Sequence, residues 1–227
     1  MRPAWVRRSI EHVIRQFCDN PAYCWIGAAT LQGMNGTNEG GLARRGGRYE
    51  TLPDIDIHLS EGFLWRPDKG SDPPELWLAP TKTGYRSAYE RFAKRYLGAA
   101  GLNGADVQID HMFPKKAAAL GGLGYVRMLA VPPASNMAAG RTLERAMVAR
   151  NEDFGPRTKP TRLATYFTIG KATGFIGYEQ MPDDEKSRPN AQLSGALMAH
   201  LRREGLPADL LAEMDEDLTA GTASILR

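Results

Sequence analysis

Side chains suited to acid–base chemistry and to metal binding gather between residues 106 and 150. Asp110 and His111 are adjacent, and Glu144 lies eight residues after Asn136. A neutral imidazole can take a proton from water near pH 7. Carboxylate and amide oxygens are ligands for a hard cation such as Mg²⁺. Together these groups could hydrolyse a phosphodiester, which requires an activated water and charge stabilisation on the phosphate.

The same stretch predicts two strands and a helix that would bring these groups together. Apolar residues at every second position predict a half-buried strand over residues 107–111. An Ala/Gly/Lys-rich loop follows, and then a continuous apolar run over residues 125–131 predicts a second strand. Ser135 is a favourable N-cap for one helix that carries both Asn136 and Glu144. A compact ββα unit is therefore expected.

This order of residues resembles the ββα-metal nucleases, also called HNH or His-Me finger nucleases. Asp110-His111 is followed by Pro114, by the second strand and by Asn136 at the start of the helix. The resemblance implies that His111 is the general base and that Asp110 and Asn136 hold one Mg²⁺ or Mn²⁺. It also implies that Glu144 supports the metal through water. The helix has no metal-binding histidine and no CxxC knuckle flanks the unit, which favours the Asp-His…Asn variety.

Basic side chains around this unit fit a polyanionic substrate. The net charge of +3 and the isoelectric point of about 8.9 are compatible with nucleic acid. Arg127 and Arg141 are candidates to bind the charge that develops on the phosphate. Further contacts to nucleic acid, with DNA favoured over RNA, are expected from Lys82, Arg86, Lys94, Arg95, Lys115, Lys116 and Arg145.

The whole chain is expected to form an α+β fold, with the ββα-metal core embedded in a mixed, irregular single domain with flanking helices. We divide it into an N-terminal α/β region of unknown role (1–81), a basic helix with the nuclease core (82–150) and a C-terminal part that packs on the core (151–227). Helices are predicted over residues 4–18, 83–97, 190–204 and 207–218, and strands over 50–60 and 76–78. Over residues 163–178 a hairpin is preferred, with a glycine-interrupted helix as the alternative.

Two other functions compete with the nuclease. Asp54, Asp56 and His58 would share one face of the strand over residues 50–60, where they could serve a different metal hydrolase or form a solvated face. Alternatively, the protein is a non-catalytic adaptor that binds nucleic acid or protein. In an adaptor Asp110, His111 and Asn136 need not converge.

Other features limit the location and the partners. No apolar run reaches the length of a membrane span, and the N-terminus lacks the apolar core of a secretory signal. Cys18 and Cys24 have the spacing of neither a zinc knuckle nor a disulfide framework. We therefore expect a cytoplasmic protein, with delivery into a target cell as the alternative. A toxin or effector, a mobile-element nuclease and a defence nuclease all fit, and an inhibitory or immunity protein is a candidate partner. The glycine-rich loop over residues 33–48 could close on a nucleic-acid backbone.

Overall fold

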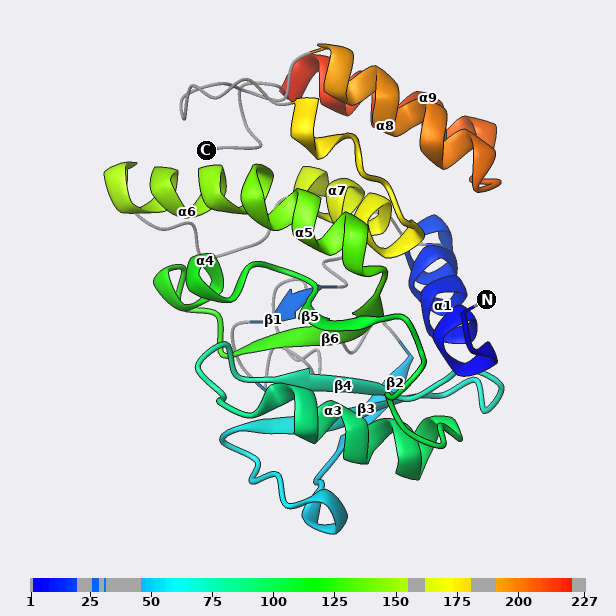
Figure 1. Cartoon of the computed structure of the whole chain (residues 1–227), viewed down its shortest axis with the longest axis vertical. Coiled ribbons are helices and arrows are strands. Elements are labelled where there is room, and N and C mark those ends of the chain that lie inside the picture. Colours follow the sequence, from blue (N-terminus) through cyan, green and yellow to red (C-terminus); the bar gives the residue numbers. More distant parts are fainter. Residues whose placement is uncertain are drawn as a thin grey trace.

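The computed structural model describes residues 2–19, 26–28, 31, 46–154, 162–180 and 191–221. Figure 1 shows an antiparallel sheet in the middle of the molecule, with helices on both sides. This arrangement confirms the prediction of a mixed α+β domain. None of the described helices is long and apolar enough to cross a membrane.

Six strands of the described residues form the sheet, and every pair of neighbours is antiparallel. Their order is β1-β6-β4-β3-β2, and β5 pairs with the second half of β6. All the residues of β6 are buried, as its continuous apolar run predicts. The strands are β1 (Gly27–Ala28), β2 (Gly47–Glu50), β3 (Gly62–Pro67), β4 (Glu75–Leu78), β5 (Gln108–His111) and β6 (Tyr125–Val131).

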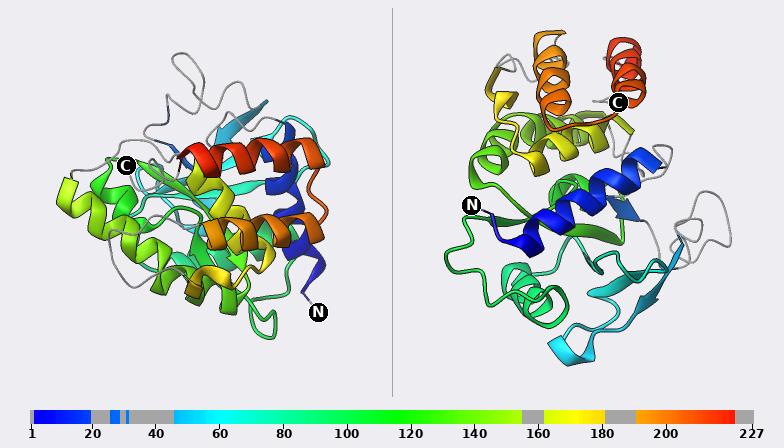
Figure 2. Two further views of the ribbon diagram at one scale, coloured as in Figure 1. Left: turned by 90° about the horizontal axis from the view of Figure 1, so that it is seen from above. Right: turned by 90° about the vertical axis from the view of Figure 1, so that its right-hand side faces the viewer.

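The helices form layers around this sheet. Figure 1 shows α5, α6 and α7 between the sheet and the α8–α9 pair, and Figure 2 shows α1 running along one side. One apolar cluster joins α1, α3, the sheet and α7 to α9, so these layers share a core. The helices are α1 (Ala4–Asp19), η2 (Pro53–Ile55), α3 (Tyr85–Phe92) continued by the π-helical turn η3 (Ala93–Leu97), α4 (Lys115–Leu120), α5 (Pro133–Arg141), α6 (Leu143–Phe154), α7 (Arg162–Thr173), η4 (Gly177–Gln180), α8 (Ala191–Arg203) and α9 (Ala208–Gly221).

The predicted strand over residues 50–60 is wrong. Pro53 opens the short helix η2, and Asp56 then takes a left-handed conformation with φ of 53°. This turn brings Leu52 and Ile57 together as an isolated bridge. The alternating isoleucines are buried by a turn and not by a strand, so the row of Asp54, Asp56 and His58 does not form.

The preferred hairpin over residues 163–178 is also wrong, and the alternative of a helix holds as far as Thr173. The helix α7 ends at Thr173, and the next residue, Gly174, has φ of 104°. Tyr166, Phe167 and Ile169 are buried within α7. Because α7 lies between other layers, its aromatic and β-branched residues pack in the core and override their strand propensity.

The ββα unit forms with three changes. The expected loop between its strands contains α4, and the expected single helix is divided into α5 and α6 at Thr142. Pro132, and not Ser135, precedes the first helical residue. The predicted helices at residues 4–18, 83–97, 190–204 and 207–218 are confirmed, as are the strands at 76–78, 107–111 and 125–131, within a few residues at their ends.

Candidate functional site

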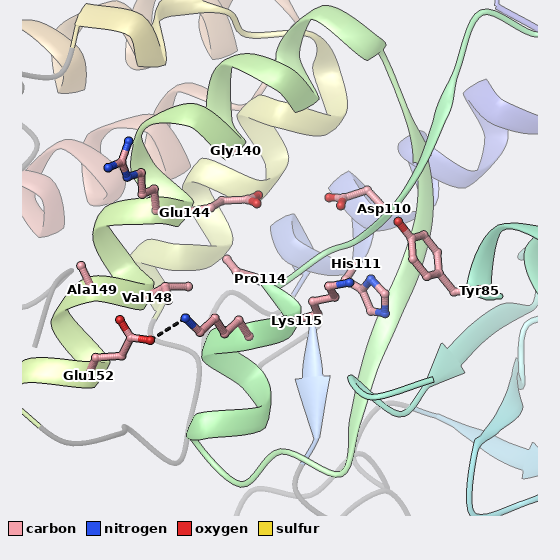
Figure 3. A pocket seen from close by; sticks show the side chains of 12 residues that line it. Tyr85, Asp110, His111, Pro114, Lys115, Gly140, Glu144, Val148, Ala149 and Glu152 are labelled. Carbon is pink, nitrogen blue, oxygen red and sulfur yellow. Dashed lines mark ion pairs between the residues drawn. The ribbon is translucent and has the colours of Figure 1, made fainter. Parts of the chain in front are cut away.

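A cavity of about 650 Å³ lies at the end of β5, where α3, α4 and α6 approach one another. Three carboxylates, an imidazole and three cations face it from these four elements. The lining residues that matter for chemistry are Tyr85, Asp110, His111, Lys115, Lys116, Glu144, Arg145 and Glu152. Figure 3 shows the carboxylates of Asp110 and Glu144 pointing toward each other across this space. The structure thus brings three of the four predicted chemical groups together.

The break between α5 and α6 positions Glu144. Thr142 has φ of −120° and ψ of −87°, which ends α5, and its hydroxyl donates to the carbonyl of Ala138 at 2.9 Å. The helix α6 starts at Leu143, so Glu144 lies in its first turn, where the partial positive charge of a helix N-terminus favours a carboxylate. Asp110 is held by the pairing of β5 with β6, in which it lies opposite Leu129.

Lys171 of α7 pairs with both carboxylates. Its ammonium donates to Oδ2 of Asp110 and to Oε1 of Glu144. The Lys171 side chain is 3% exposed, whereas those of Asp110 and Glu144 are 20% and 22% exposed. Burial alone would lower the pKa of Lys171, but the charges of Asp110 and Glu144 outweigh it and raise that pKa. Lys171 is therefore a buried cation at the base of the site.

Two hydrogen bonds hold α7 in the position that Lys171 needs. The Ser135 hydroxyl of α5 donates to the carbonyl of Lys171 itself at 2.7 Å. The Thr168 hydroxyl donates to the carbonyl of Met112, just after β5, at 2.8 Å. Because α7 is fixed to both α5 and the end of β5, Lys171 reaches both acids.

The pKa of Glu144 is raised above its ordinary value. Burial is the largest cause that raises the pKa of Glu144, and the charge of Asp110 adds to it. The ammonium of Lys171 opposes both effects and lowers this pKa, but the net shift is upward. Removing Lys171 would therefore leave two acids that repel each other.

His111 is a buried, neutral imidazole at pH 7. Burial lowers its pKa to about 4, with smaller lowering effects of Lys115 and Lys171, although Asp110 raises it. Its ring meets the ring of Tyr85 edge to face, with centroids 4.8 Å apart, and Lys115 Nζ lies 5.8 Å from the same Tyr85 ring. Nε2 is buried, and neither ring nitrogen has a hydrogen-bond partner among the described residues. The imidazole is thus free to accept a proton.

Asn136 is not brought to the cavity. Its side-chain amide donates to Oε1 of Gln108 at 2.8 Å, and it does not line the cavity. Gln108 and Asp110 lie on the same face of β5 because side chains alternate along a strand. Asn136 therefore contacts Gln108, the residue that precedes Asp110 on this face of β5. This contact corrects the expected role of Asn136 as a direct metal ligand.

Arg127 also lies elsewhere. It is 2% exposed, and its guanidinium contacts Gln16 Oε1 at 2.6 Å and Glu75 Oε1 at 3.3 Å. His12 contacts the same Glu75 oxygen at 3.0 Å. Burial would raise the pKa of Glu75, but Arg127 and His12 lower it to about 2. Arg127 therefore stabilises the core between β6, β4 and α1 and is not available to a phosphate.

Arg141, at the end of α5, is exposed and outside the cavity lining.

The other predicted basic contacts divide into two groups. Lys115, Lys116 and Arg145 line the cavity, and Lys116 also pairs with Glu152 at 2.5 Å. The rest lie on outer surfaces, where three of them form ion pairs. These pairs are Lys82–Glu61 at 2.7 Å, Lys94–Glu90 at 3.0 Å and Arg95–Asp54 at 3.4 Å, while Arg86 is exposed on α3.

The alternative metal site at residues 54–58 is not assembled. Asp54 pairs with Arg95, and Nδ1 of His58 lies 2.9 Å from the hydroxyl of Ser60. Within the described ranges no three His, Cys, Asp or Glu side chains are grouped to hold a metal. Most of the glycine-rich loop expected over residues 33–48 lies outside the described residues, as does Cys24.

Sequence reasoning missed Lys171 because residues 163–178 were interpreted as a hairpin. Had they been interpreted as a buried helix, Lys171 would have been a lone cation among apolar residues. A buried lysine requires carboxylate partners, and this requirement is the signal that could have found it. The contact of Tyr85 with His111 could not be foreseen, because Tyr85 lies in a helix distant in sequence from β5.

The donors at the cavity fit one divalent ion. Lys171 uses one oxygen of each acid, which leaves Oδ1 of Asp110 and Oε2 of Glu144 with no hydrogen bond among the described residues. Magnesium often binds one or two carboxylates and completes its shell with water and substrate phosphate.

When the chain is compared with family models, with curated proteins and with solved structures, none of them matches it significantly.

Proposed function

We propose that the protein is a metal-dependent endonuclease that hydrolyses phosphodiester bonds, with DNA favoured as the substrate. The observation that supports this proposal is the convergence of Asp110, His111 and Glu144 on one cavity. Lys115 and Arg145 at the same cavity suit the phosphates of a nucleic acid. The resemblance to the Asp-His…Asn variety of His-Me finger nucleases rests on Asp110-His111, Pro114, the second strand and Asn136 in that order, of which Asn136 lies outside the cavity lining.

In the proposed mechanism His111 takes a proton from a water molecule whose oxygen attacks phosphorus. The bond from phosphorus to the leaving O3′ breaks, and that oxygen takes a proton from solvent, which leaves a 5′-phosphate. The low pKa of His111, about 4, keeps the imidazole neutral at pH 7, although it also makes it a weak base. Lys115 and Arg145 hold the phosphate. Asp110 and Glu144 would bind one Mg²⁺ or Mn²⁺, which supplies charge stabilisation at the phosphate and the leaving oxygen.

The test is cleavage of plasmid DNA and of total RNA by the purified protein, with Mg²⁺ or Mn²⁺ and with EDTA. We expect metal-dependent cutting, and we expect His111→Ala to lower its rate by at least about 100-fold, as removal of a general base does. The matched control is His58→Ala, because His58 is exposed and bonds only within its own turn. Equal loss in both variants, or full activity of His111→Ala, would exclude His111 as the base.

One observation favours the second candidate, an adaptor that binds nucleic acid without cutting it. Lys171 already pairs with both acids, so the site is partly neutralised before any ion binds. An adaptor would bind DNA or RNA through Lys115, Lys116 and Arg145 in the presence of EDTA, and it would cut neither polymer under any metal. A binding assay beside the cleavage assay separates the two functions.

A further inference from the structure

We propose that Lys171 is a built-in cation of this site, a positioning residue that holds Asp110 and Glu144 together and weakens their binding of a divalent ion. This inference rests on the proposed metal-dependent function. The residue approaches the acids from α7 and does not line the cavity itself. It therefore acts on the ion through the two carboxylates.

The geometry leaves one oxygen of each acid for an ion. The ammonium of Lys171 donates to Oδ2 of Asp110 and to Oε1 of Glu144. Oε2 of Glu144 lies 4.0 Å from the point where a Cβ on Gly140 would be, and Gly140 lines the cavity. The second oxygen of Glu144 thus lies next to a cavity-lining residue that has no side chain.

Charge decides how strongly these acids hold an ion. Two carboxylates and one ammonium carry a net charge of −1, whereas the acids alone would carry −2. A divalent cation is attracted more strongly to the second arrangement, and the difference is large where the groups are mostly shielded from water. Lys171 therefore lowers the affinity for the ion while it keeps the acids close together.

The same charge count predicts how the chain folds. Asp110 and Glu144 face each other with about a fifth of each side chain exposed, so without a cation between them they would repel. Lys171 supplies that cation from within the chain. The protein should fold without metal, and its melting temperature should respond only weakly to Mg²⁺ or Mn²⁺.

The experiment replaces Lys171 by methionine, which has a similar length and no charge. We expect Lys171→Met to melt below the wild type in EDTA and to gain more from Mn²⁺ than the wild type does. By calorimetry, the affinity of the variant for Mn²⁺ should rise about tenfold or more, which is the effect of removing one nearby positive charge. Lys94→Met is the matched control, because Lys94 is an exposed lysine paired with Glu90, and it should change neither quantity.

A second variant covers the case in which Lys171→Met does not fold in EDTA. Lys171→Met/Glu144→Gln removes one negative charge as well, so it should melt above Lys171→Met in EDTA and lose the gain in Mn²⁺ affinity. If the double variant is no more stable than the single one, Lys171 does not act by charge compensation and the inference is overturned.

The outcomes separate this inference from the proposed function. Metal-dependent cutting by the wild type, combined with no gain in Mn²⁺ affinity in Lys171→Met, would overturn the inference alone. Absence of both Mn²⁺ binding and cutting in the wild type, with Lys171→Met also failing to bind Mn²⁺, would overturn both. Tighter Mn²⁺ binding by Lys171→Met supports the inference whether or not the wild type cuts.

Discussion

His111 is the residue whose surroundings most restrict its chemistry. Its side chain is buried beneath Tyr85, and burial is the main reason that its pKa lies near 4. A proton on this imidazole would have to be stabilised without solvent and close to Lys115 and Lys171. The folded state therefore strongly prefers neutral His111, and this preference affects stability as well as catalysis.

The first prediction concerns stability against pH. Unfolded His111 binds a proton near its ordinary pKa of 6.5, whereas folded His111 does so only near 4. As the pH falls, the unfolded state binds a proton at His111 before the folded state does. The free energy of unfolding therefore falls between pH 6.5 and about pH 4. The loss should reach roughly 3 kcal/mol at pH 4. Denaturant unfolding at pH 7 and pH 4 measures it, and His111→Gln should show a smaller fall by about that amount. An equal fall in both proteins would contradict the prediction.

The second prediction concerns the tyrosine that covers this imidazole. Tyr85→Ala removes a ring 4.8 Å from the His111 ring, so water should reach the imidazole and its pKa should rise from about 4 toward 6.5. NMR titration of the His111 ring protons gives the value. Tyr85→Phe keeps the ring and should leave the pKa low, and a low pKa in Tyr85→Ala would show that other groups cause the burial.

Among the elements, α7 has the greatest effect on the site. It supplies Lys171, and it packs against α8 where its backbone comes close. A Cβ on Gly170 would lie 2.5 Å from Cδ1 of Leu197 and 2.9 Å from Oη of Tyr178. The absence of a side chain at Gly170 is therefore what lets α7 approach α8 this closely.

The third prediction compares two glycines in neighbouring helices. Gly170→Ala should lower the free energy of unfolding by about 1–3 kcal/mol, because the new methyl group overpacks the contact with Leu197. A methyl group added at Gly195 of α8 would meet no described atom within 4 Å, so Gly195→Ala should stabilise the protein by about 0.5–1 kcal/mol. Thermal or urea unfolding of both variants is the measurement. The same sign for both would refute this account of the packing.

The sequence predicts an element well where its pattern and its environment agree. The alternation over residues 107–111 survives in β5 as a strand with one buried and one half-buried face, because one side of it packs on the core. Leu193, Leu197 and Leu201 recur every four residues in the sequence, and all three are buried in α8 for the same reason. Such periodic patterns predict both the element and its buried face.

Where an element is buried on all sides, its sequence shows no apolar period, and local propensity then predicts the wrong structure. This explains the wrong hairpin at α7, and with it the missing Lys171. In the candidate site, Asp110, His111 and Glu144 could be predicted, because they belong to a short unit with a clear order. Asn136 and Arg127 were misplaced because their positions depend on partners distant in sequence, Gln108 for Asn136 and Glu75 with Gln16 for Arg127.

Across the whole molecule, a second buried ionic group links parts that lie far apart in the chain. Glu75 of β4 receives contacts from His12 and Gln16 of α1, from Arg127 of β6 and from the indole of Trp77 at 2.9 Å. The residues of this group come from the N-terminal helix and from two neighbouring strands. It therefore fixes α1 to the sheet.

The fourth prediction tests that role. Arg127→Met should lower the free energy of unfolding by about 3–5 kcal/mol, because it leaves the buried carboxylate of Glu75 without its main compensating charge. Arg95→Met, which breaks an exposed pair with Asp54, should change it by less than about 1 kcal/mol. Chemical unfolding gives both values. If Arg127→Met instead keeps full stability and loses nucleic-acid binding, Arg127 belongs to the functional site after all.

The contribution of α7 to the site has a consequence during protein synthesis. A growing chain exposes β5, β6 and α6 before residue 171 has been added. At that stage Asp110 and Glu144 exist without the ammonium that holds them together. The cluster of Asp110, Glu144 and Lys171 can therefore be completed only after α7 has left the ribosome and docked, so a chain that stalls before α7 would carry the acids and the imidazole without their assembled arrangement.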